Sequence, residues 1–221
     1  MATYKQGVHG DFSGRVGNIV GSSWKGRSVM KIRPAKVNNP RTPSQQANRG
    51  RFSLMGRFLS TQSRLIRIGW NAVAQNTTAF NEAMRFNLAE AIGGEHPDQF
   101  IDFSKIKLSS GQLPVPANLQ AAGASAQSLN LTWENNSGQE LANGSDLLMV
   151  GLYDQDSEEG YTLTGNFTRE QEAALIALPD NWKNRTVEVF VFMVSTLGIG
   201  SLNSAEYISP TVYAGNVVLT D

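Results

Sequence analysis

The sequence contains no cysteine and only two histidines, His9 and His96. The lack of cysteine excludes disulfides, thiolate metal sites and a thiol nucleophile. Long apolar runs are also lacking, and the run over residues 189–194 is far shorter than the ~20 residues that span a bilayer. The first residues show no apolar run after a positive start, so we expect no secretory signal. A membrane is therefore not among the expected partners.

The sequence patterns of common catalytic sites are missing as well. There is no Gly-x-Ser-x-Gly elbow, and the glycine-rich residues 14–26 lack the Ser or Thr that follows Lys in a phosphate-binding loop. The four carboxylates of residues 154–159 lack the spacing of a helix-loop-helix calcium loop, and Glu95 and His96 are adjacent, a poor arrangement for one ion. We therefore expect no catalytic residue, cofactor, metal or small-molecule substrate.

Each half of the chain is poor in charged residues of one sign: the first half in acidic residues and the second half in basic ones. Residues 1–112 hold 16 Lys/Arg and 6 Asp/Glu, a net charge of +10. Residues 113–221 hold 3 Lys/Arg and 13 Asp/Glu, a net charge of −10. This asymmetry indicates two modules and a partner for the basic one. We place the boundary in the Pro- and Gly-containing residues 109–116, which gives a basic module over residues 1–112 and an acidic module over residues 113–221.

The basic module begins with strand patterns and continues with helical ones. Residues 16–20 and 28–33 are typical of short strands, and the turn-forming residues between them predict a hairpin. A capping box over residues 42–45, with Pro43 at the first helical position, predicts the start of a helix.

Two more helices and one strand are expected before the boundary. A helix is predicted over residues 64–74. A clearer one follows Thr78 as the capping residue and ends at Gly93-Gly94. Residues 100–108 are predicted to form a strand.

The acidic module consists of short strand patterns separated by turn signals. Such spacing is typical of a β-sandwich. The predicted strands cover residues 128–133, 147–153, 161–164, 186–194 and 205–209, while residues 174–178 fit either a strand or a helix. We expect Trp133 to pack between the two sheets.

The acidic module resembles a known fold family. The stretch LPVPANL at residues 113–119, followed by SLNLTW at residues 128–133, resembles the start of a fibronectin type III module, and GIGSLNS at residues 198–204 resembles its turn into the last strand. Val187 or Val189 stands where that family usually has an aromatic residue. The resemblance implies an Ig-like or fibronectin type III-like β-sandwich.

Almost the whole chain also resembles an uncharacterised family of about this length from Bacteroidota and their phages. The resemblance rests on GRVGNIVGSSWKG at residues 14–26 and NPRTPSQ at residues 39–45, with shorter matches at residues 78–81 and 101–105. The family has no assigned activity. Its occurrence in phages implies a structural role in particles, an argument by analogy.

The basic residues are the candidate binding residues. From Lys5 to Arg67 there are 13 Lys/Arg and one acid, Asp11, and Trp24 and Trp70 fall in or near this region. Basic residues interleaved with aromatic ones suit nucleic acid. They suit equally a contact with the acidic module of another copy. An ordinary solvated face is the third explanation. The candidates are Lys25, Arg27, Lys31, Arg33, Arg41, Arg49, Arg51, Arg57, Arg64 and Arg67.

From these observations we predict an α+β chain in which a β-hairpin plus helical module precedes the sandwich. The predicted function is that of a non-enzymatic structural or assembly protein of a phage particle or phage-derived assembly, located in the virion or the cytoplasm. Its expected partners are other copies of the chain or other structural proteins. The alternative is a nucleic-acid-binding protein that uses the basic N-terminal half.

Overall fold

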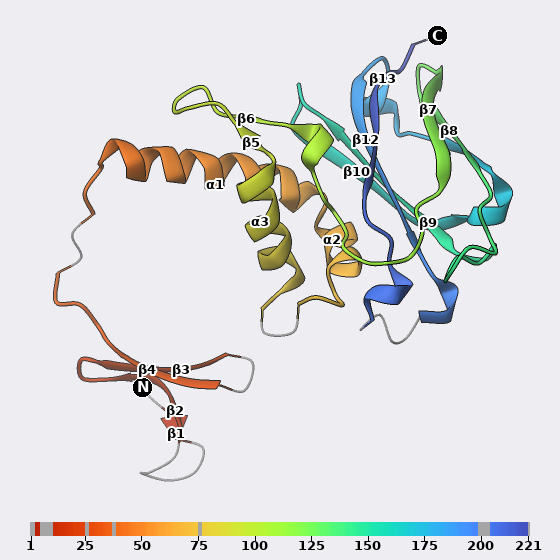
Figure 1. The fold of residues 1–221 in the computed structure, drawn as a ribbon. Coiled ribbons are helices and arrows are strands. Elements are labelled where there is room, and N and C mark those ends of the chain that lie inside the picture. Colours follow the sequence, from red (N-terminus) through yellow and green to blue (C-terminus); the bar gives the residue numbers. More distant parts are fainter. Residues whose placement is uncertain are drawn as a thin grey trace. The chain divides into compact units, whose positions relative to one another are not determined.

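The computed structural model describes residues 3–4, 11–24, 27–36, 39–74, 77–198 and 204–220. The chain forms two compact units, Met1–Thr42 and Pro43–Asp221. We call them the N-terminal unit and the body (Figure 1). This division differs from the predicted boundary, because residues 109–116 lie inside the body.

The N-terminal unit is one antiparallel sheet in the order β1-β2-β3-β4. Its strands are β1 (Thr3–Tyr4), β2 (Phe12–Val16), β3 (Ile19–Trp24) and β4 (Arg27–Ile32). Strands β3 and β4 form a hairpin, as predicted, but the predicted turn over residues 21–27 is too long, because residues 21–24 and 27 pair within the strands. The predicted strand over residues 16–20 is wrong, because Gly17 and Asn18 form the turn between β2 and β3. Gly17 has φ +59°, which glycine adopts without strain.

Three helices open the body: α1 (Pro43–Thr61), α2 (Ser63–Gly69) and α3 (Ala79–Glu90). The predicted cap of α3 is confirmed, since the Thr78 side chain accepts a hydrogen bond of 3.2 Å from the Asn81 N–H. Helix α2 ends five residues before the predicted Ala74. At its end, Gly69 packs so closely on Leu108 that a Cβ there would lie 2.4 Å from the Leu108 carbonyl oxygen.

Residues 100–108 do not form the predicted long strand. Only β6 (Phe100–Ile101) is extended, and it pairs with β5 (Ile92–Gly93). A short 3-10 helix, η1 (Phe103–Lys105), follows because the Asp102 carboxylate accepts the Ser104 N–H and starts a turn. The chain then runs to the sandwich.

The rest of the body is the predicted β-sandwich of two antiparallel sheets. One sheet has the order β10-β9-β12-β13 and the other β11-β8-β7. The strands are β7 (Ala117–Ser125), β8 (Ser128–Glu134), β9 (Leu147–Asp154), β10 (Glu159–Thr168), β11 (Ala173–Ala177), β12 (Thr186–Val194) and β13 (Val212–Val218). Of the ambiguous residues 174–178, residues 174–177 are therefore strand, and Leu178 follows the strand.

The last strand is not where the pattern placed it. Residues 205–209 hold a 3-10 helix, η5 (Ala205–Tyr207), and an isolated bridge from Ile208 to Val194. Strand β13 closes the sheet instead. Residues 198–204 resemble a turn of the fibronectin type III module, and within them residues 199–203 lie outside the described residues.

The first core of the body lies between the two sheets. Trp133 is 4% exposed there, as expected, and its indole N–H donates to the Arg169 carbonyl at 2.8 Å. Alternate residues of the strands supply the remainder, among them Leu129, Leu131, Leu148, Val150, Val187 and Val189.

The second core lies between the sheet β10-β9-β12-β13 and the helices, which cover its outer face in Figure 1. Phe58 of α1 packs edge-on against Tyr153, with ring centroids 4.9 Å apart, and contacts Phe190 of β12 at 5.8 Å. Between α1 and α2, the buried Gln62 side chain donates to the Leu152 carbonyl at 2.9 Å. The helices therefore cannot be separated from the sandwich at residue 112, because β9 and β12 are buried on both faces. No helix among the described residues combines the length and the apolarity needed to cross a membrane.

Candidate assembly surface

The register of the N-terminal sheet sorts its side chains onto two different faces. Residues directly opposite each other in antiparallel strands point to the same face, and neighbours along a strand alternate. Val16 pairs with Ile19, Ile19 with Ile32, and Gly21 with Met30. These residues carry no charge, so we call this side the apolar face. Its side chains are largely uncovered, with Met30 65% and Ile32 77% exposed.

The opposite side is the basic face. Arg15 and Lys31 both pair with Val20, and Arg27 pairs with Trp24, which is 58% exposed. Arg15, Arg27 and Lys31 are exposed as well. The basic face therefore offers three cations and one indole ring, together with Val29, which is 48% exposed.

Phe12 packs closely on Gly21 within the N-terminal sheet. A Cβ added to Gly21 would lie 2.7 Å from the Phe12 ring and 2.3 Å from the Phe12 carbonyl oxygen. Position 21 therefore requires glycine. Phe12 covers Gly21, while Val16, Ile19, Met30 and Ile32 remain beside it.

The structure divides the ten predicted binding residues between the two units. Lys25 lies outside the described residues. Arg27 and Lys31 share the basic face, and Arg33 and Arg41 follow β4 along the chain. The other five lie on the first two helices of the body: Arg49, Arg51 and Arg57 on α1, and Arg64 and Arg67 on α2. Arg15 also belongs to the basic face, but the sequence patterns did not select it, since they did not give the register.

Arg51 and Arg57 are among the predicted binding residues that make contacts within the body. Arg51 donates to the Leu88 carbonyl of α3 at 2.9 Å. Arg57 forms an ion pair of 3.1 Å with Glu158 in the turn between β9 and β10, where both side chains are about half exposed. An exposed ion pair contributes only ~0–1 kcal/mol. Both side chains thus help to hold α1 in place, so they are poor probes of binding to a partner.

Charge follows the two units closely. The N-terminal unit, residues 1–42, holds 8 Lys/Arg and 1 Asp/Glu, a net charge of +7. The body, residues 43–221, holds 11 Lys/Arg and 18 Asp/Glu, a net charge of −7. The separation of charge is therefore a property of the compact units and does not depend on the boundary predicted from the sequence.

The acidic residues 154–159 are organised by an arginine. Arg185 donates to Asp154 at 2.8 Å and to Glu159 at 2.9 Å, and the Ser157 hydroxyl donates to Asp154 at 2.7 Å. Burial raises the pKa of Asp154, but these hydrogen bonds and that of the Asp156 N–H outweigh burial and hold the pKa below its ordinary 3.8. The acidic stretch of residues 154–159 is thus buried at its first residue, Asp154.

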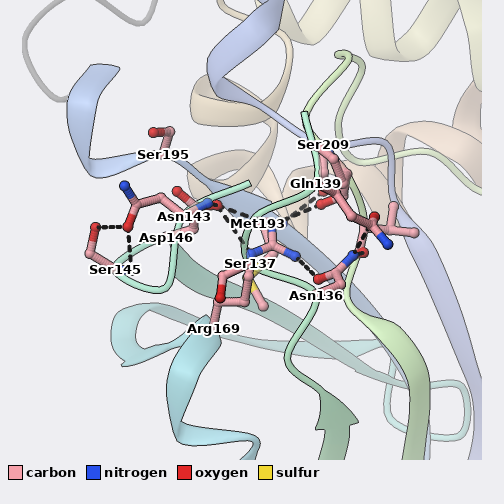
Figure 2. A network of polar contacts seen from close by, with 12 residues as sticks. Asn136, Ser137, Gln139, Asn143, Ser145, Asp146, Arg169, Met193, Ser195 and Ser209 are labelled. Carbon is pink, nitrogen blue, oxygen red and sulfur yellow. Dashed lines mark hydrogen bonds and ion pairs between the residues drawn. The ribbon is translucent and has the colours of Figure 1, made fainter. Parts of the chain in front are cut away.

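A second, buried ionic network lies on the connections that flank strands β7 to β10 (Figure 2). Arg169 and Asp146 are fully buried and pair at 3.1 Å. Arg169 also donates to the Asn136 side chain and, at 2.8 Å, to the Pro114 carbonyl. Burial lowers the pKa of Arg169, and Asp146 opposes this effect. Because removal of one member of such a pair costs ~3–5 kcal/mol, we assign this network a structural role.

The described residues hold no group of three or more His, Cys, Asp or Glu that is placed to bind a metal ion. Glu95 and His96 lie in the loop between β5 and β6, where both are exposed. The surface with the most distinct chemistry is therefore the two-faced sheet of the N-terminal unit.

These features define a class of protein: a small basic sheet joined to an acidic β-sandwich whose outer face is covered by helices. The chain belongs to a family described as "Family of unknown function (DUF6266)", whose profile matches residues 11–209. No curated protein matches the sequence.

Among solved structures, the chain is similar to fibronectin type III domains. The domain of the human collagen alpha-1(XX) chain shows 15% identity and a TM-score of 0.35, over 51% of this chain and 90% of that one. The FN5 domain of Drosophila Lar shows 8% identity and a TM-score of 0.32, over 48% and 95%. A domain of human contactin 1 shows 12% identity and a TM-score of 0.33, over 51% and 84%.

Proposed function

We propose that this chain is a non-enzymatic structural or assembly protein in which the N-terminal unit docks the body onto another copy or onto another protein of the same assembly. The proposed assembly is a phage particle or a phage-derived structure. The observation that carries the proposal is the net charge of +7 on the N-terminal unit and of −7 on the body.

Opposite charges on two units of one chain favour association between copies. A contact from the basic unit of one copy to the acidic body of the next is heterologous, so it closes into a ring or continues as a filament. Charge complementarity of this kind speeds and orients association more than it tightens it. A structural protein that must meet identical neighbours benefits from both effects.

Nucleic acid is the second candidate partner, and the basic face supports it. Trp24 is 58% exposed and pairs with Arg27 in the sheet, so an indole ring and a guanidinium lie side by side. Stacking of a base on an aromatic ring and neutralisation of phosphate are the two parts of single-strand binding. In this second candidate, the N-terminal unit binds the nucleic acid and the body is the domain attached to it.

Charge reversal separates the two candidates. We would compare two double variants with the same change in charge. One carries Arg27→Glu and Lys31→Glu on the basic face, and the other carries Arg64→Glu and Arg67→Glu on α2. Each protein is sedimented at 0.05 M and at 1 M NaCl, with and without single-stranded DNA. If the N-terminal unit docks through its cations, only the first pair of substitutions weakens self-association, and the effect is largest at low salt.

The results divide as follows. Self-association without DNA supports assembly. A monomer that binds DNA with an affinity falling steeply with salt supports the second candidate and overturns the first. A protein that stays monomeric and binds no DNA overturns both candidates, provided it is tested up to about 100 times the micromolar dissociation constants of typical transient contacts.

A further inference from the structure

The apolar face of the N-terminal unit has chemistry that the charge argument does not use. Val16, Ile19, Met30 and Ile32 are 45%, 38%, 65% and 77% exposed, although they lie on one side of one sheet. Side chains of this size are normally buried, and each gains ~1.5–3 kcal/mol from complete burial. A group of them on one face indicates a surface that is covered when the protein functions.

The size of the unit points in the same direction. A unit of 42 residues is close to the limit below which a fold needs disulfides, a metal or association with another chain. The sequence has no cysteine, and the described residues offer no cluster for a metal. The apolar face of a sheet is also normally buried against another element. Association is the remaining route.

The chemistry of the face selects its occupant. No charged side chain lies among its paired residues, since Arg15, Arg27 and Lys31 all belong to the basic face. An acidic partner is attracted to the basic face, whereas the apolar face fits an apolar, uncharged surface. Two copies of the same face meet this requirement without burying a charge.

The body offers no comparable surface among its described residues. Its exposed large apolar side chains lie singly on separate elements or loops: Phe52, Val73, Phe100, Leu141, Leu175, Leu197 and Val218. Scattered apolar residues of this kind are normal on a protein surface. A second N-terminal unit is therefore the best match that this chain provides.

We propose that the apolar face of the N-terminal unit packs against the same face of a second copy, so that Val16, Ile19, Met30 and Ile32 of both copies form a shared core. The contact is isologous and has two-fold symmetry. This inference rests on the proposed assembly function and names the partner of the unit's uncharged side. The cations of both sheets then point outward, available to acidic bodies of further copies.

The two kinds of contact respond to salt in opposite ways. Contact through the basic face weakens as salt rises, because the charges are screened beyond ~3 Å at 1 M. Pairing of apolar faces persists at 1 M NaCl and strengthens in sulfate, since such salts favour apolar burial and screen the repulsion between two basic units. A dimer that survives 1 M NaCl is the expected product in the full-length protein.

Neighbouring residues of β4 supply the matched variants. Met30 lies on the apolar face and Val29 on the basic face of the same strand. Met30→Lys introduces a charge into the proposed core and should weaken the dimer at 1 M NaCl at least about tenfold. Val29→Lys introduces the same charge outside it and should leave the dissociation constant within about threefold. Equal effects of both substitutions, or an effect of Val29→Lys alone, would overturn the pairing of apolar faces.

A second measurement does not depend on the stability of the variants. The chain lacks cysteine, so Met30→Cys and Val29→Cys each give a protein with a single thiol. A short bis-maleimide should link two copies of the Met30→Cys protein, because packed sheet faces lie ~10 Å apart. It should link the Val29→Cys protein several-fold less. Linking of Val29→Cys at the higher yield contradicts the inference.

The outcomes also keep this inference apart from the proposed function. If assembly occurs but only the charge reversals on the basic face disturb it, the inference fails and the proposed function stands. If the full-length protein is a monomer at both salt concentrations, the inference fails, and so does the part of the proposed function that names another copy as the partner. If Met30→Lys abolishes the dimer that remains at 1 M NaCl, both are supported.

Discussion

Asp154 links the stability of the body to pH. Its carboxylate is 3% exposed and accepts hydrogen bonds from Ser157, Asp156 and Arg185, which together hold its folded-state pKa below 3.8. A carboxylate with a lowered pKa stabilises the folded state above its unfolded-state pKa, and this contribution is lost as pH falls through the folded-state value.

We therefore predict that the free energy of unfolding decreases between pH 5 and pH 3 and that Asp154→Asn makes this decrease smaller. Urea denaturation at a series of pH values, followed by circular dichroism, measures both curves. Arg185→Met should reduce the pH dependence in the same direction, because it removes the cation that pairs with Asp154. An Asp154→Asn protein with the full pH dependence of the parent would refute the role of this carboxylate.

At the scale of elements, α1 forms part of the same core as the sandwich. Phe58 is fully buried and its ring contacts Phe103, Tyr153 and Phe190, whereas Phe52 on the same helix is 58% exposed. Phe58→Ala should lower the free energy of unfolding of the whole body by about 3–5 kcal/mol. Phe52→Ala should change it by less than about 1 kcal/mol. A sandwich that melts unchanged while only the helical signal falls would show that the helices fold separately.

The strands that could be predicted are those with strong apolar patterns. Strand β12 matches residues 186–194, and β8 differs from its prediction by one residue. Strand β7 was not predicted because it is rich in Ala and Gly, which have low strand propensity. Strand β13 was missed because Gly215, at φ +102°, accompanies a shift in register and looks like a turn in the sequence.

The two faces of the candidate surface could not be derived in the same way. The apolar pattern predicts one strand over residues 16–20, although Gly17 and Asn18 form a turn. An error of this kind changes which side chains share a face, since neighbours alternate along a strand. Basic residues could be counted from the sequence, but their separation from Val16, Ile19, Met30 and Ile32 required the register.

At the scale of the whole molecule, the division into units replaces the boundary predicted at residue 112. The predicted boundary lies where the net charge of the sequence changes sign. The structure places it after Thr42, because the second core buries the helices against β9 and β12. Sequence periodicity shows that a helix has an apolar face but does not identify the surface that the face covers.

We predict that a fragment of residues 43–221 unfolds in one cooperative transition and remains monomeric where the full-length chain associates. A fragment of residues 113–221 should bind a dye for exposed apolar surface and melt at lower temperature, since Met149, Phe190 and Phe192 lose their cover. Differential scanning calorimetry and sedimentation provide the measurements. Association of residues 43–221 with the affinity of the full chain would contradict a docking role for the N-terminal unit.

The division of charge also governs how the chain behaves during purification. With 19 Lys/Arg, 19 Asp/Glu and an isoelectric point near 6.8, its overall composition predicts no retention on either type of ion exchanger at neutral pH. The charges of opposite sign lie, however, on separate compact units. We therefore expect the unit of +7 to bind a cation exchanger and the unit of −7 to bind an anion exchanger, so that both resins retain the chain.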